Sequence, residues 1–351
     1  MHAEAVTALV AWYHQHKRDL PWRVLDKRPD PYPIWVSEIM LQQTQVKTVL
    51  PYFKRFMQTL PTVSALAGAS DHVLLKLWEG LGYYNRARHM HAAAKIIALS
   101  GWPKTYDALQ ALPGLGFYTA AAVASIAFKE PVPVVDGNVI RVITRLAGLQ
   151  EDSTTQQMKQ TLFNRLKPLI QDHDPAVFNQ ALMELGALLC SPKQPQCHAC
   201  PVASYCVARK QNCINKIPNR PKKKPVPHYT IGVGVIYRDN KILIGKRKAN
   251  QMLGGLWEFP GGKQQPPEPI VQTVIREVKE ETGLDIRCTA CIAIVKHAYT
   301  HFKITVHAYR CVCDSDDEPI AHTTDALHWV DYQALDAYPF PTASRKIIRL
   351  L

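Results

Sequence analysis

A short proline-rich and basic stretch, IPNRPKKKPVP at 217–227, divides the chain into two parts with different hydrophobic patterns. Its four prolines disfavour both helix and strand and favour an extended spacer. Before it, apolar residues recur at helical spacing; after it, β-rich runs such as TIGVGVIY and FKITVHAYRCVC surround one helical segment, EPIVQTVIREVKEETG. The pattern predicts an all-α domain over 1–215, a linker over 216–227 and an α+β domain over 228–351.

Charge is concentrated in the first part and the linker. The net charge of +13 includes five basic and no acidic residues in 216–224, whereas 225–351 carries 15 basic and 14 acidic residues. Such an excess favours a polyphosphate partner, although a solubilising surface would explain the charge alone equally well. The N-terminus lacks the features of a signal peptide, and the longest apolar run, 119–128, is too short to span a bilayer. We therefore expect a cytoplasmic, nucleoid-associated protein with no membrane partner.

Five of the nine cysteines lie between 190 and 213, and none lies in the first 189 residues. Four of them form the spacing C-x6-C-x2-C-x5-C: Cys190, Cys197, Cys200 and Cys206. Four thiolates so close in sequence predict a metal site, and either zinc or a cubane iron–sulfur cluster would accept them. Only one short C-x2-C pair is present, and this favours iron–sulfur. Cys213 is left over and is not expected to be a ligand.

The segment LPGLGFYTA at 112–120 places Gly114 and Gly116 directly before an alanine-rich, helix-forming run. Backbone N–H groups at a helix start, together with the helix dipole, can hold a phosphate oxygen. A turn that only connects two helices would have the same pattern. The segment therefore indicates close approach to the backbone, by a phosphate or by another helix.

Several motifs together resemble the helix-hairpin-helix base-excision DNA glycosylases. LPGLGFYTA resembles their hairpin, VVDGNVIR at 134–141 their catalytic aspartate segment, and the cysteine loop at 190–206 their cluster loop. WVSEIMLQQTQV at 35–46 and GLGYYNRAR at 80–88 narrow the resemblance to the A/G-specific adenine DNA glycosylases of the MutY type. The resemblance covers nearly the whole chain. It implies a [4Fe-4S] cluster on the four cysteines and double-stranded DNA as the partner.

The resemblance also assigns the chemistry. Tyr118 stands where the related endonuclease III type has a lysine that attacks the sugar, and tyrosine forms no Schiff base, so a monofunctional enzyme is implied. Glu38 resembles the general acid that protonates adenine N7 and later assists water. Asp136 resembles the carboxylate that stabilises the cationic sugar, including through a transient covalent bond. Asn138 and Tyr118 are expected to orient these groups. Without the resemblance, a surface acid or a helix cap would explain either carboxylate.

Adenine must leave the duplex to be reached, so a pocket and a wedge are required. Trp22 and Arg23 in LPWR resemble pocket residues, and Glu184 in ALMELGA is expected to hydrogen-bond the extruded base. The residues expected to fill the vacated stack and press on the opposite base are Gln42, Gln43 and Tyr83. Core packing is the alternative for Trp22 and Tyr83.

The second part carries G-x5-E-x7-R-E-V-x-E-E-x-G-L over 262–284, a complete Nudix box. Glu277, Glu280 and Glu281 lie within about one helical turn and could hold Mg²⁺ against a diphosphate, or form a solvated acidic helix face. In the resembled family this domain is similar to the nucleotide hydrolase MutT, recognises 8-oxoguanine in DNA and commonly has a degraded box. This chain departs from that pattern. We expect base recognition, for which Mg²⁺ is not required.

The loop KHAYTHFKI at 296–304 resembles the one with which the family reads 8-oxoguanine. Its three candidate residues are Tyr299, Thr300 and His301. They keep an aromatic ring, a hydroxyl and a histidine in the family's order, although two of the three differ from the usual Phe-Ser-His. A hydroxyl can sense the O8 and N7–H that distinguish 8-oxoguanine from guanine. A polar β-turn is the alternative.

The sequence thus predicts a monomeric, monofunctional glycosylase that hydrolyses the bond to adenine mispaired with 8-oxoguanine or guanine. Two alternatives stay open. One is a bifunctional glycosylase/lyase for oxidised pyrimidines, which Tyr118, Asn138 and the C-terminal domain oppose. The other is a Nudix nucleotide diphosphohydrolase whose helical part only binds nucleic acid.

Overall fold

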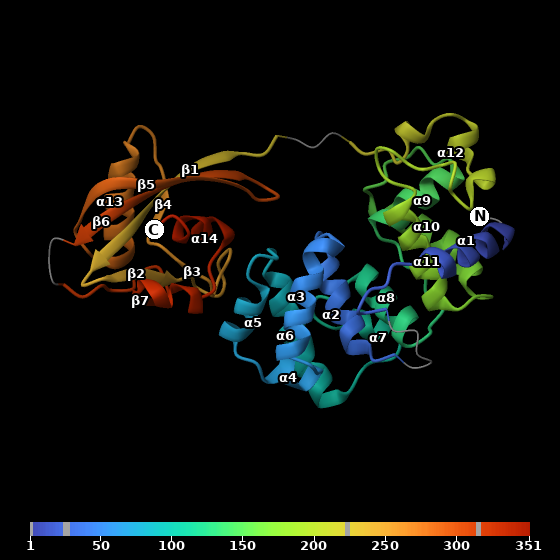
Figure 1. Ribbon diagram of the computed structural model, residues 1–351, viewed down its shortest axis with the longest axis horizontal. Helices are drawn as coiled ribbons and strands as arrows, with labels where there is room; N and C mark the ends of the chain where they lie inside the picture. Colours follow the sequence, from blue (N-terminus) through green and yellow to red (C-terminus); the bar gives the residue numbers. More distant parts are fainter. Residues whose placement is uncertain (1–2, 24–28, 222–224, 314–316) are drawn as a thin grey trace. The chain divides into compact units, whose positions relative to one another are not determined.

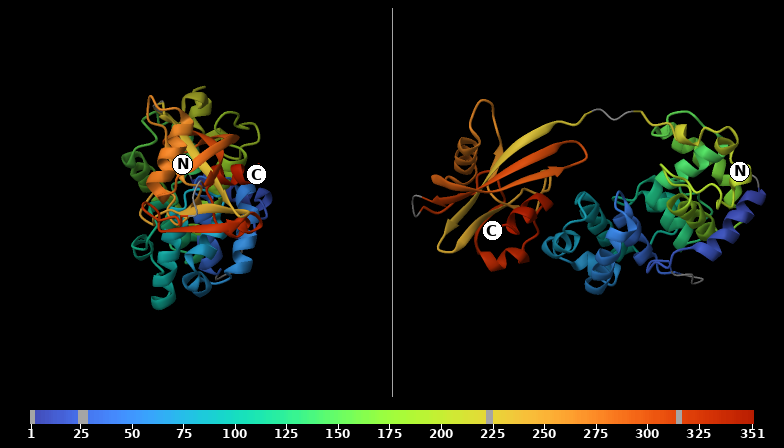
Figure 2. Two further views of the ribbon diagram at one scale, coloured as in Figure 1. Left: turned by 90° about the vertical axis from the view of Figure 1, so that its left-hand side faces the viewer. Right: turned by 45° about the horizontal axis from the view of Figure 1, so that its top comes forward.

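The computed structural model describes residues 3–23, 29–221, 225–313 and 317–351, which form two compact units (Figures 1 and 2). The first, here called the helical unit, contains Met1–Gly68 and His89–Lys223. The second, called the sheet unit, contains Lys224–Leu351 together with the Ala69–Arg88 segment. This segment belongs to the first part by sequence, so the structural units cross the predicted sequence division at one place.

The helical unit is built from short and medium helices, with two 3-10 turns near the cysteines. Its helices are α1 (Ala3–His16), α2 (Pro31–Leu41), α3 (Val46–Thr59), α4 (Val63–Gly68), α6 (Asn85–Ser100, which starts in the Ala69–Arg88 segment), α7 (Tyr106–Gln110), α8 (Phe117–Ala127), α9 (Gly137–Ala147), α10 (Gln156–Ile170), α11 (Pro175–Leu188) and α12 (Val207–Lys210). The 3-10 turns are η1 (Ala203–Tyr205) and η2 (Ile214–Lys216). Within the described residues, no helix is both long and apolar enough to cross a membrane.

Aspartates define the starts of three helices that carry candidate site residues. Asp30 accepts a hydrogen bond from the backbone of α2, Asp136 from α9 and Asp174 from α11. A side-chain acceptor at this position satisfies N–H groups that have no partner inside the helix. Proline follows Asp30 and Asp174 at the first helical position, where its missing N–H costs nothing.

The predicted hairpin is formed by α7, the turn 111–116 and α8. Gly114 has φ +77°, and a Cβ there would lie 2.6 Å from Cβ of His89. Gly116 instead has an ordinary φ of −77°, and a Cβ there would meet nothing within 4 Å. The two glycines therefore do different things, because Gly114 admits a packed helix whereas Gly116 leaves the start of α8 open.

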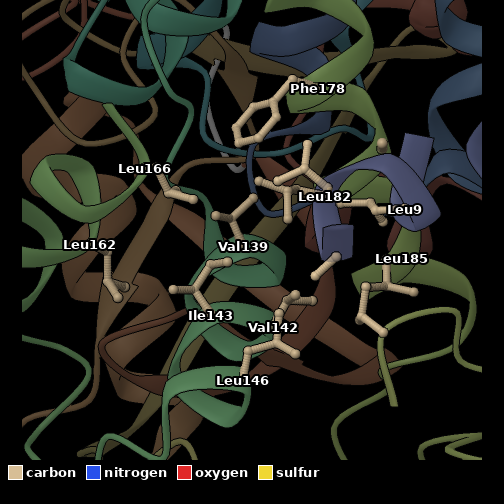
Figure 3. Close-up of a cluster of buried hydrophobic side chains, with 14 of the residues drawn as sticks. Leu9, Val139, Val142, Ile143, Leu146, Leu162, Leu166, Phe178, Leu182 and Leu185 are labelled. Atoms are coloured by element: carbon tan, nitrogen blue, oxygen red, sulfur yellow. The ribbon is translucent and has the colours of Figure 1, made fainter. Parts of the chain in front are cut away.

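The core of the helical unit lies where α1, α9, α10 and α11 meet, and Figure 3 shows part of it. Successive turns of α9 point Val139, Val142, Ile143 and Leu146 into this core, as the 3.6-residue period requires. Asp136 precedes the first of these turns. Burial of this helix face therefore holds the candidate catalytic aspartate in place.

The described residues of the sheet unit form a mixed seven-stranded sheet in the order β3-β2-β1-β6-β5, with β4 also paired to β1 and β7 to β2. Strands β1 and β6 are parallel, and the other pairs are antiparallel. The strands are β1 (His228–Arg238), β2 (Lys241–Lys246), β3 (Trp257–Glu258), β4 (Gly261–Lys263), β5 (Ile286–Ala298), β6 (Lys303–Cys313) and β7 (Ala326–Asp331). The helices of this unit are α5 (Asp71–Trp78), α13 (Ile270–Thr282), η3 (Tyr332–Ala337) and α14 (Thr342–Ile348).

Each face of the sheet is covered by one helix. Ile236 and Leu243 pack on one face with residues of α13, whereas Val235, Ile242 and Ile244 pack on the other with residues of α14. This alternation is the two-residue period of a strand buried on both faces. The predicted fold class, an all-α hairpin domain followed by an α+β Nudix-like domain, is confirmed.

Candidate active site and base-recognition loop

One pocket of about 490 Å³ in the helical unit collects most of the candidate catalytic residues. Its lining includes Trp22, Arg23, Glu38, Tyr118, Asp136, Asn138 and Glu184. These residues come from the 18–23 loop, α2, α8, α9 and α11, which are far apart in sequence. The pocket therefore exists only in the folded helical unit.

Glu38 lies on the buried face of α2 and is only 5% exposed. The Tyr118 hydroxyl of α8 donates a hydrogen bond to its Oε2. Burial raises the pKa of Glu38 to about 7, with a smaller contribution from the charge of Asp136, while the Tyr118 hydrogen bond and the charge of Arg23 act in the opposite direction. A carboxyl group with this pKa exists in both protonation states near neutral pH, as a general acid requires.

The carboxylate of Asp136 caps the N-terminus of α9 and also lines the pocket. Oδ1 accepts from the backbone N–H of Val139 at 2.7 Å and of Asn138 at 3.0 Å, and Oδ2 accepts from Asn138 Nδ2 at 3.0 Å. Burial raises its pKa above the ordinary value, and these donors act against burial. Fixed donors on both oxygens favour the ionised form. Glu38 and Asp136 thus share a pocket but have different environments.

Asn138, which donates to Asp136, is itself held by Arg141 and by the close approach of α11. Arg141 donates from Nη2 to Asn138 Oδ1 at 2.8 Å and from Nε to the carbonyl of Cys190 at 2.7 Å. A Cβ on Gly186 would lie 2.6 Å from Cβ of Asn138, so α9 and α11 approach closely at this point. The start of α9 is therefore connected through Arg141 to the first cysteine of the candidate cluster loop.

Glu184 is completely buried and forms ion pairs with two arginines. Arg18 donates from its backbone N–H, Nε and Nη2, and Arg23 from Nη1 and Nη2, at 2.7–2.9 Å. Burial alone would raise the pKa of Glu184, but these donors lower it to about 2. Both carboxylate oxygens are engaged, so any hydrogen bond to a base would share them with the arginines. Its predicted contact with adenine stays a prediction.

The remaining predicted residues of the helical unit lie at and beside the pocket. Trp22 is 6% exposed, lines the pocket and packs edge-on against Phe53 at 5.1 Å, so it combines pocket and core roles. Gln42 donates from Nε2 to Thr119 Oγ1 at 2.9 Å. Gln43 follows α2 with φ +59° and is exposed. Neither glutamine lines the pocket, and their place in the DNA stack stays a prediction.

The four cysteines of the 190–206 loop line a single cavity. None of the four forms a disulfide. Within the described part of the chain, no three histidine, cysteine or acidic side chains converge closely enough to bind one metal ion. Burial raises the pKa of Cys200 to about 11, and the other three sulfur atoms add to this shift. The four cysteines therefore share one cavity.

In the sheet unit, the predicted reader loop lies between β5 and β6. Thr300 is exposed, and its Oγ1 is 2.5 Å from the hydroxyl of Tyr83, which the Ala69–Arg88 segment contributes. Tyr83 is 45% exposed and has φ +49°. Tyr299 points inward and packs against Phe302 and His297, and its burial raises its pKa. His301 is exposed. Two residues predicted from distant motifs, Tyr83 and Thr300, are thus in contact.

The Nudix box forms its expected loop and helix, but its carboxylates face different partners. Arg276 forms ion pairs with Glu268, Glu277 and Glu280. Glu281 accepts from the Gly261 N–H at 2.9 Å, and burial raises its pKa to about 7. Glu280 is 57% exposed. Arg276 thus pairs with two of the three candidate Mg²⁺ ligands, and the carboxylate of the third, Glu281, accepts from the backbone of β4.

Two family models match the chain, one in each part. Residues 36–168 match the HhH-GPD superfamily of base excision DNA repair proteins, and residues 232–350 match the NUDIX domain. The human adenine DNA glycosylase is 33% identical over 98% of this chain and 73% of its own length. That of Buchnera aphidicola subsp. Baizongia pistaciae is 34% identical over 97% of this chain and 94% of its own. The chain belongs to the adenine DNA glycosylase family.

The fold of the helical unit has relatives among solved structures. A thermostable thymine-DNA glycosylase has a TM-score of 0.53 and 27% identity, and covers 59% of this chain and 95% of its own. A non-covalent endonuclease III–DNA complex, at 22% identity and a TM-score of 0.51, shows the same fold. As a member of the adenine DNA glycosylase family, the chain is a base-excision DNA glycosylase and therefore a hydrolase of N-glycosyl bonds. The predicted family, fold and enzyme class are confirmed.

The structure adds pocket residues that sequence reasoning missed. Arg18 lies in the same loop as Trp22 and Arg23 and lines the pocket with them, as do Gln180 and Met183 of α11. A spacing signal exists for Gln180, because it lies one helical turn before Glu184 on the same face of α11. For Arg18 there is no such signal, since a loop arginine between Lys17 and Asp19 is ordinarily solvated. In this adenine DNA glycosylase, its role follows only from its contact with Glu184.

Proposed function

We propose that this glycosylase removes adenine opposite 8-oxoguanine or guanine in duplex DNA and does not cut the strand. The observation that carries the proposal is the pairing of Glu38, with a pKa of about 7, with Asp136 in one pocket. A carboxyl group that can deliver a proton near neutral pH, beside a carboxylate whose oxygens are held by fixed donors, is the division of labour needed to break a glycosidic bond.

In the first step, Glu38 protonates the leaving base. Tyr118 donates to Oε2 of Glu38, which leaves the transferable proton for Oε1. Proton transfer to adenine N7 lets the base leave with the electron pair of the C1′–N9 bond, so a neutral adenine departs from a cationic sugar. Glu38 is then a carboxylate.

In the second step, Asp136 stabilises the cationic sugar and water completes the reaction. Both oxygens of Asp136 are fixed by donors from the start of α9, so its charge is oriented before the sugar becomes positive. The attacking water adds its oxygen to C1′ and gives its proton to the Glu38 carboxylate. This restores the acid and leaves an abasic site.

Tyr118 supports a reaction without strand cleavage. A lyase needs an amine that forms a Schiff base with C1′, whereas a phenol hydrogen-bonded to Glu38 offers none. Burial is the largest cause that raises the pKa of Tyr118 well above its ordinary value, and the charge of Glu38 adds to it. The hydroxyl therefore remains a hydrogen-bond donor during catalysis.

The cavity lined by Cys190, Cys197, Cys200 and Cys206 supports a [4Fe-4S] cluster. A single zinc ion requires four sulfurs about 2.3 Å from one point. A cubane places its thiolates around a larger body, and the four cysteines line one cavity. When bound, the cluster would cross-link the loop 190–206, which Arg141 connects to the start of α9.

The sheet unit supports recognition of the opposite base over nucleotide hydrolysis. Thr300 and Tyr83 are exposed and adjacent, so a hydroxyl and an aromatic ring are presented together. The Nudix carboxylates are instead engaged by Arg276 and by the Gly261 N–H. A DNA substrate also agrees with the open backbone at Gly116 and with the basic helical part.

Strand cleavage tests the proposal against the lyase alternative. A labelled A:8-oxoguanine duplex should stay intact with wild-type protein until alkali is added, and it should then break at the adenine. Borohydride trapping should be negative. Tyr118→Lys places an amine in the pocket and should give trapped complex, whereas Tyr118→Phe, a matched control, should not. Cleavage by the wild type without alkali would contradict the proposal.

A further inference from the structure

Glu79, at the C-terminal end of α5, attaches the Ala69–Arg88 segment to the rest of the sheet unit. Its Oε1 accepts from Arg345 Nε at 2.5 Å and from the backbone N–H of Phe340 at 2.8 Å. Its Oε2 accepts from Lys76 Nζ at 2.8 Å. The side chains of Glu79 and Arg345 are 15% and 14% exposed, so this ion pair is largely shielded from water.

Arg345 is held firmly on its own side of the contact. It donates from Nη2 to the carbonyl of Tyr338 at 2.5 Å and from Nη1 to Asp336 at 2.7 Å, and it stacks over the Phe340 ring at 5.2 Å. These groups lie on η3 and on the 338–341 link to α14. The guanidinium is therefore a fixed anchor, and the position of Glu79 depends on it.

The loop that follows Glu79 has a fixed shape. Trp78 Nε1 donates to the carbonyl of Gly82 at 3.1 Å, and Arg86 Nη2 donates to the carbonyls of Leu81 and Gly82, each at 3.1 Å. Gly80 and Gly82 have φ of +97° and +70°, values that glycine adopts readily. A displacement of Glu79 is therefore transmitted through this loop to Tyr83.

Lys76 and His72 of the segment also contact Tyr338. Tyr83 makes a further contact with the rest of the sheet unit, through Thr300. Its own backbone is left-handed, a conformation that a tyrosine adopts only when its surroundings impose it. The hydroxyl contact is exposed, whereas the Glu79–Arg345 pair is shielded. The exposed contact is the weaker of the two, because water competes for both hydroxyls.

We propose that Glu79 and Arg345 are positioning residues for discrimination of the base opposite adenine. Their ion pair holds Tyr83 beside Thr300, so that the ring and the hydroxyl meet the opposite base as one preorganised surface. Both charged side chains are largely buried, so the role assigned to them is indirect. This inference rests on the proposed function, because it assigns a specificity role within it.

The test compares single-turnover adenine excision from A:8-oxoguanine and A:G duplexes, at saturating enzyme. Glu79→Gln keeps an acceptor but removes the charge, and Arg345→Glu places two carboxylates together. Each variant should lower the ratio of the A:8-oxoguanine rate to the A:G rate by about tenfold, or to one if the wild-type ratio is smaller than that. A tenfold change is the scale of an ordinary coupling between sites. The A:G rate should stay within about twofold, since the catalytic pocket is untouched. Arg349→Glu, the same charge change at an exposed position at the end of α14, is the matched control and should keep the wild-type ratio.

A reciprocal exchange separates positioning from general damage. The double variant Glu79→Arg with Arg345→Glu restores opposite charges and should recover part of the lost ratio, which a merely misfolded protein would not do. Unchanged ratios in both single variants would overturn the proposal, as would equal losses on both duplexes without recovery in the exchange. Failure of the wild type to release adenine from either duplex would instead refute the proposed function.

Discussion

The pH dependence of excision should report the protonation of Glu38. Because its pKa lies near 7, the fraction in the acid form is about one half at pH 7, one tenth at pH 8 and one hundredth at pH 9. The acid is active when protonated, so the single-turnover rate should be level below about pH 6 and fall tenfold per pH unit on the alkaline side. This fall in rate above about pH 7 is the alkaline limb of the profile. Glu38→Gln should bind DNA but lose excision at every pH, so it should show no such limb.

Removing the Tyr118 hydroxyl should move this limb in a defined direction. The hydroxyl donates to the carboxylate and so lowers the pKa of Glu38 against the larger effect of burial. A hydrogen bond to a charged group contributes about 1.5–3 kcal/mol, which corresponds to about one to two pH units. In Tyr118→Phe the acid should therefore stay protonated to higher pH, and excision should persist at pH 8.

The assay is a single-turnover pH series from 5.5 to about 9, with abasic sites cleaved by alkali and counted on a gel. The position of the alkaline limb is the measured quantity, so a lower plateau in Tyr118→Phe leaves the comparison intact. Movement of the limb to lower pH, or no movement, would refute the assigned Tyr118–Glu38 hydrogen bond. A wild-type rate independent of pH across this range would refute Glu38 as the acid.

Three further changes test the helical unit. Glu184→Gln should reduce the free energy of unfolding at pH 7, measured by denaturant titration, by about 3 kcal/mol, which is the equivalent of the difference between a pKa of about 2 and the ordinary 4.5. Because folding lowers the pKa of Glu184, this contribution should disappear as pH falls from about 4.5 toward 2. An unchanged free energy of unfolding would contradict the buried ion pairs. Cys200→Ser should lose the brown colour of the cluster and bind DNA poorly, whereas a colourless, zinc-containing wild type would contradict the iron–sulfur assignment. Gly114→Ala should destabilise the hairpin by at least about 1–2 kcal/mol, because φ is +77° and the new methyl group would meet His89, and the matched change Gly116→Ala should have a smaller effect on thermal stability.

Much of the catalytic site could be predicted because short motifs carry it. Glu38, Tyr118 and Asp136 each lie in a distinctive stretch of sequence, and the folded helical unit does bring them to one pocket. The β-rich runs after the linker likewise predicted the α+β domain, because strand composition and periodicity are local properties. Helix starts at Asp30 and Asp136 follow from equally local capping chemistry.

What could not be predicted depends on contacts between distant positions. Glu79 and Arg345 are 266 residues apart, and neither stands out from other charged residues of its helix. The grouping of Ala69–Arg88 with the sheet unit is therefore invisible to periodicity, which contains no information about partners. Glu184 shows the same limit, because its motif predicts a polar pocket group but not the two arginines that engage both of its oxygens.

Release of free adenine tests the central claim most directly. Wild-type protein in excess should release one adenine per A:8-oxoguanine duplex, detected by chromatography, and should leave an intact strand with an alkali-labile site. The same duplex with A:T in place of the mispair should release none on this timescale. If no adenine is released from the A:8-oxoguanine duplex, or if it is released equally from A:T, the proposed function is wrong.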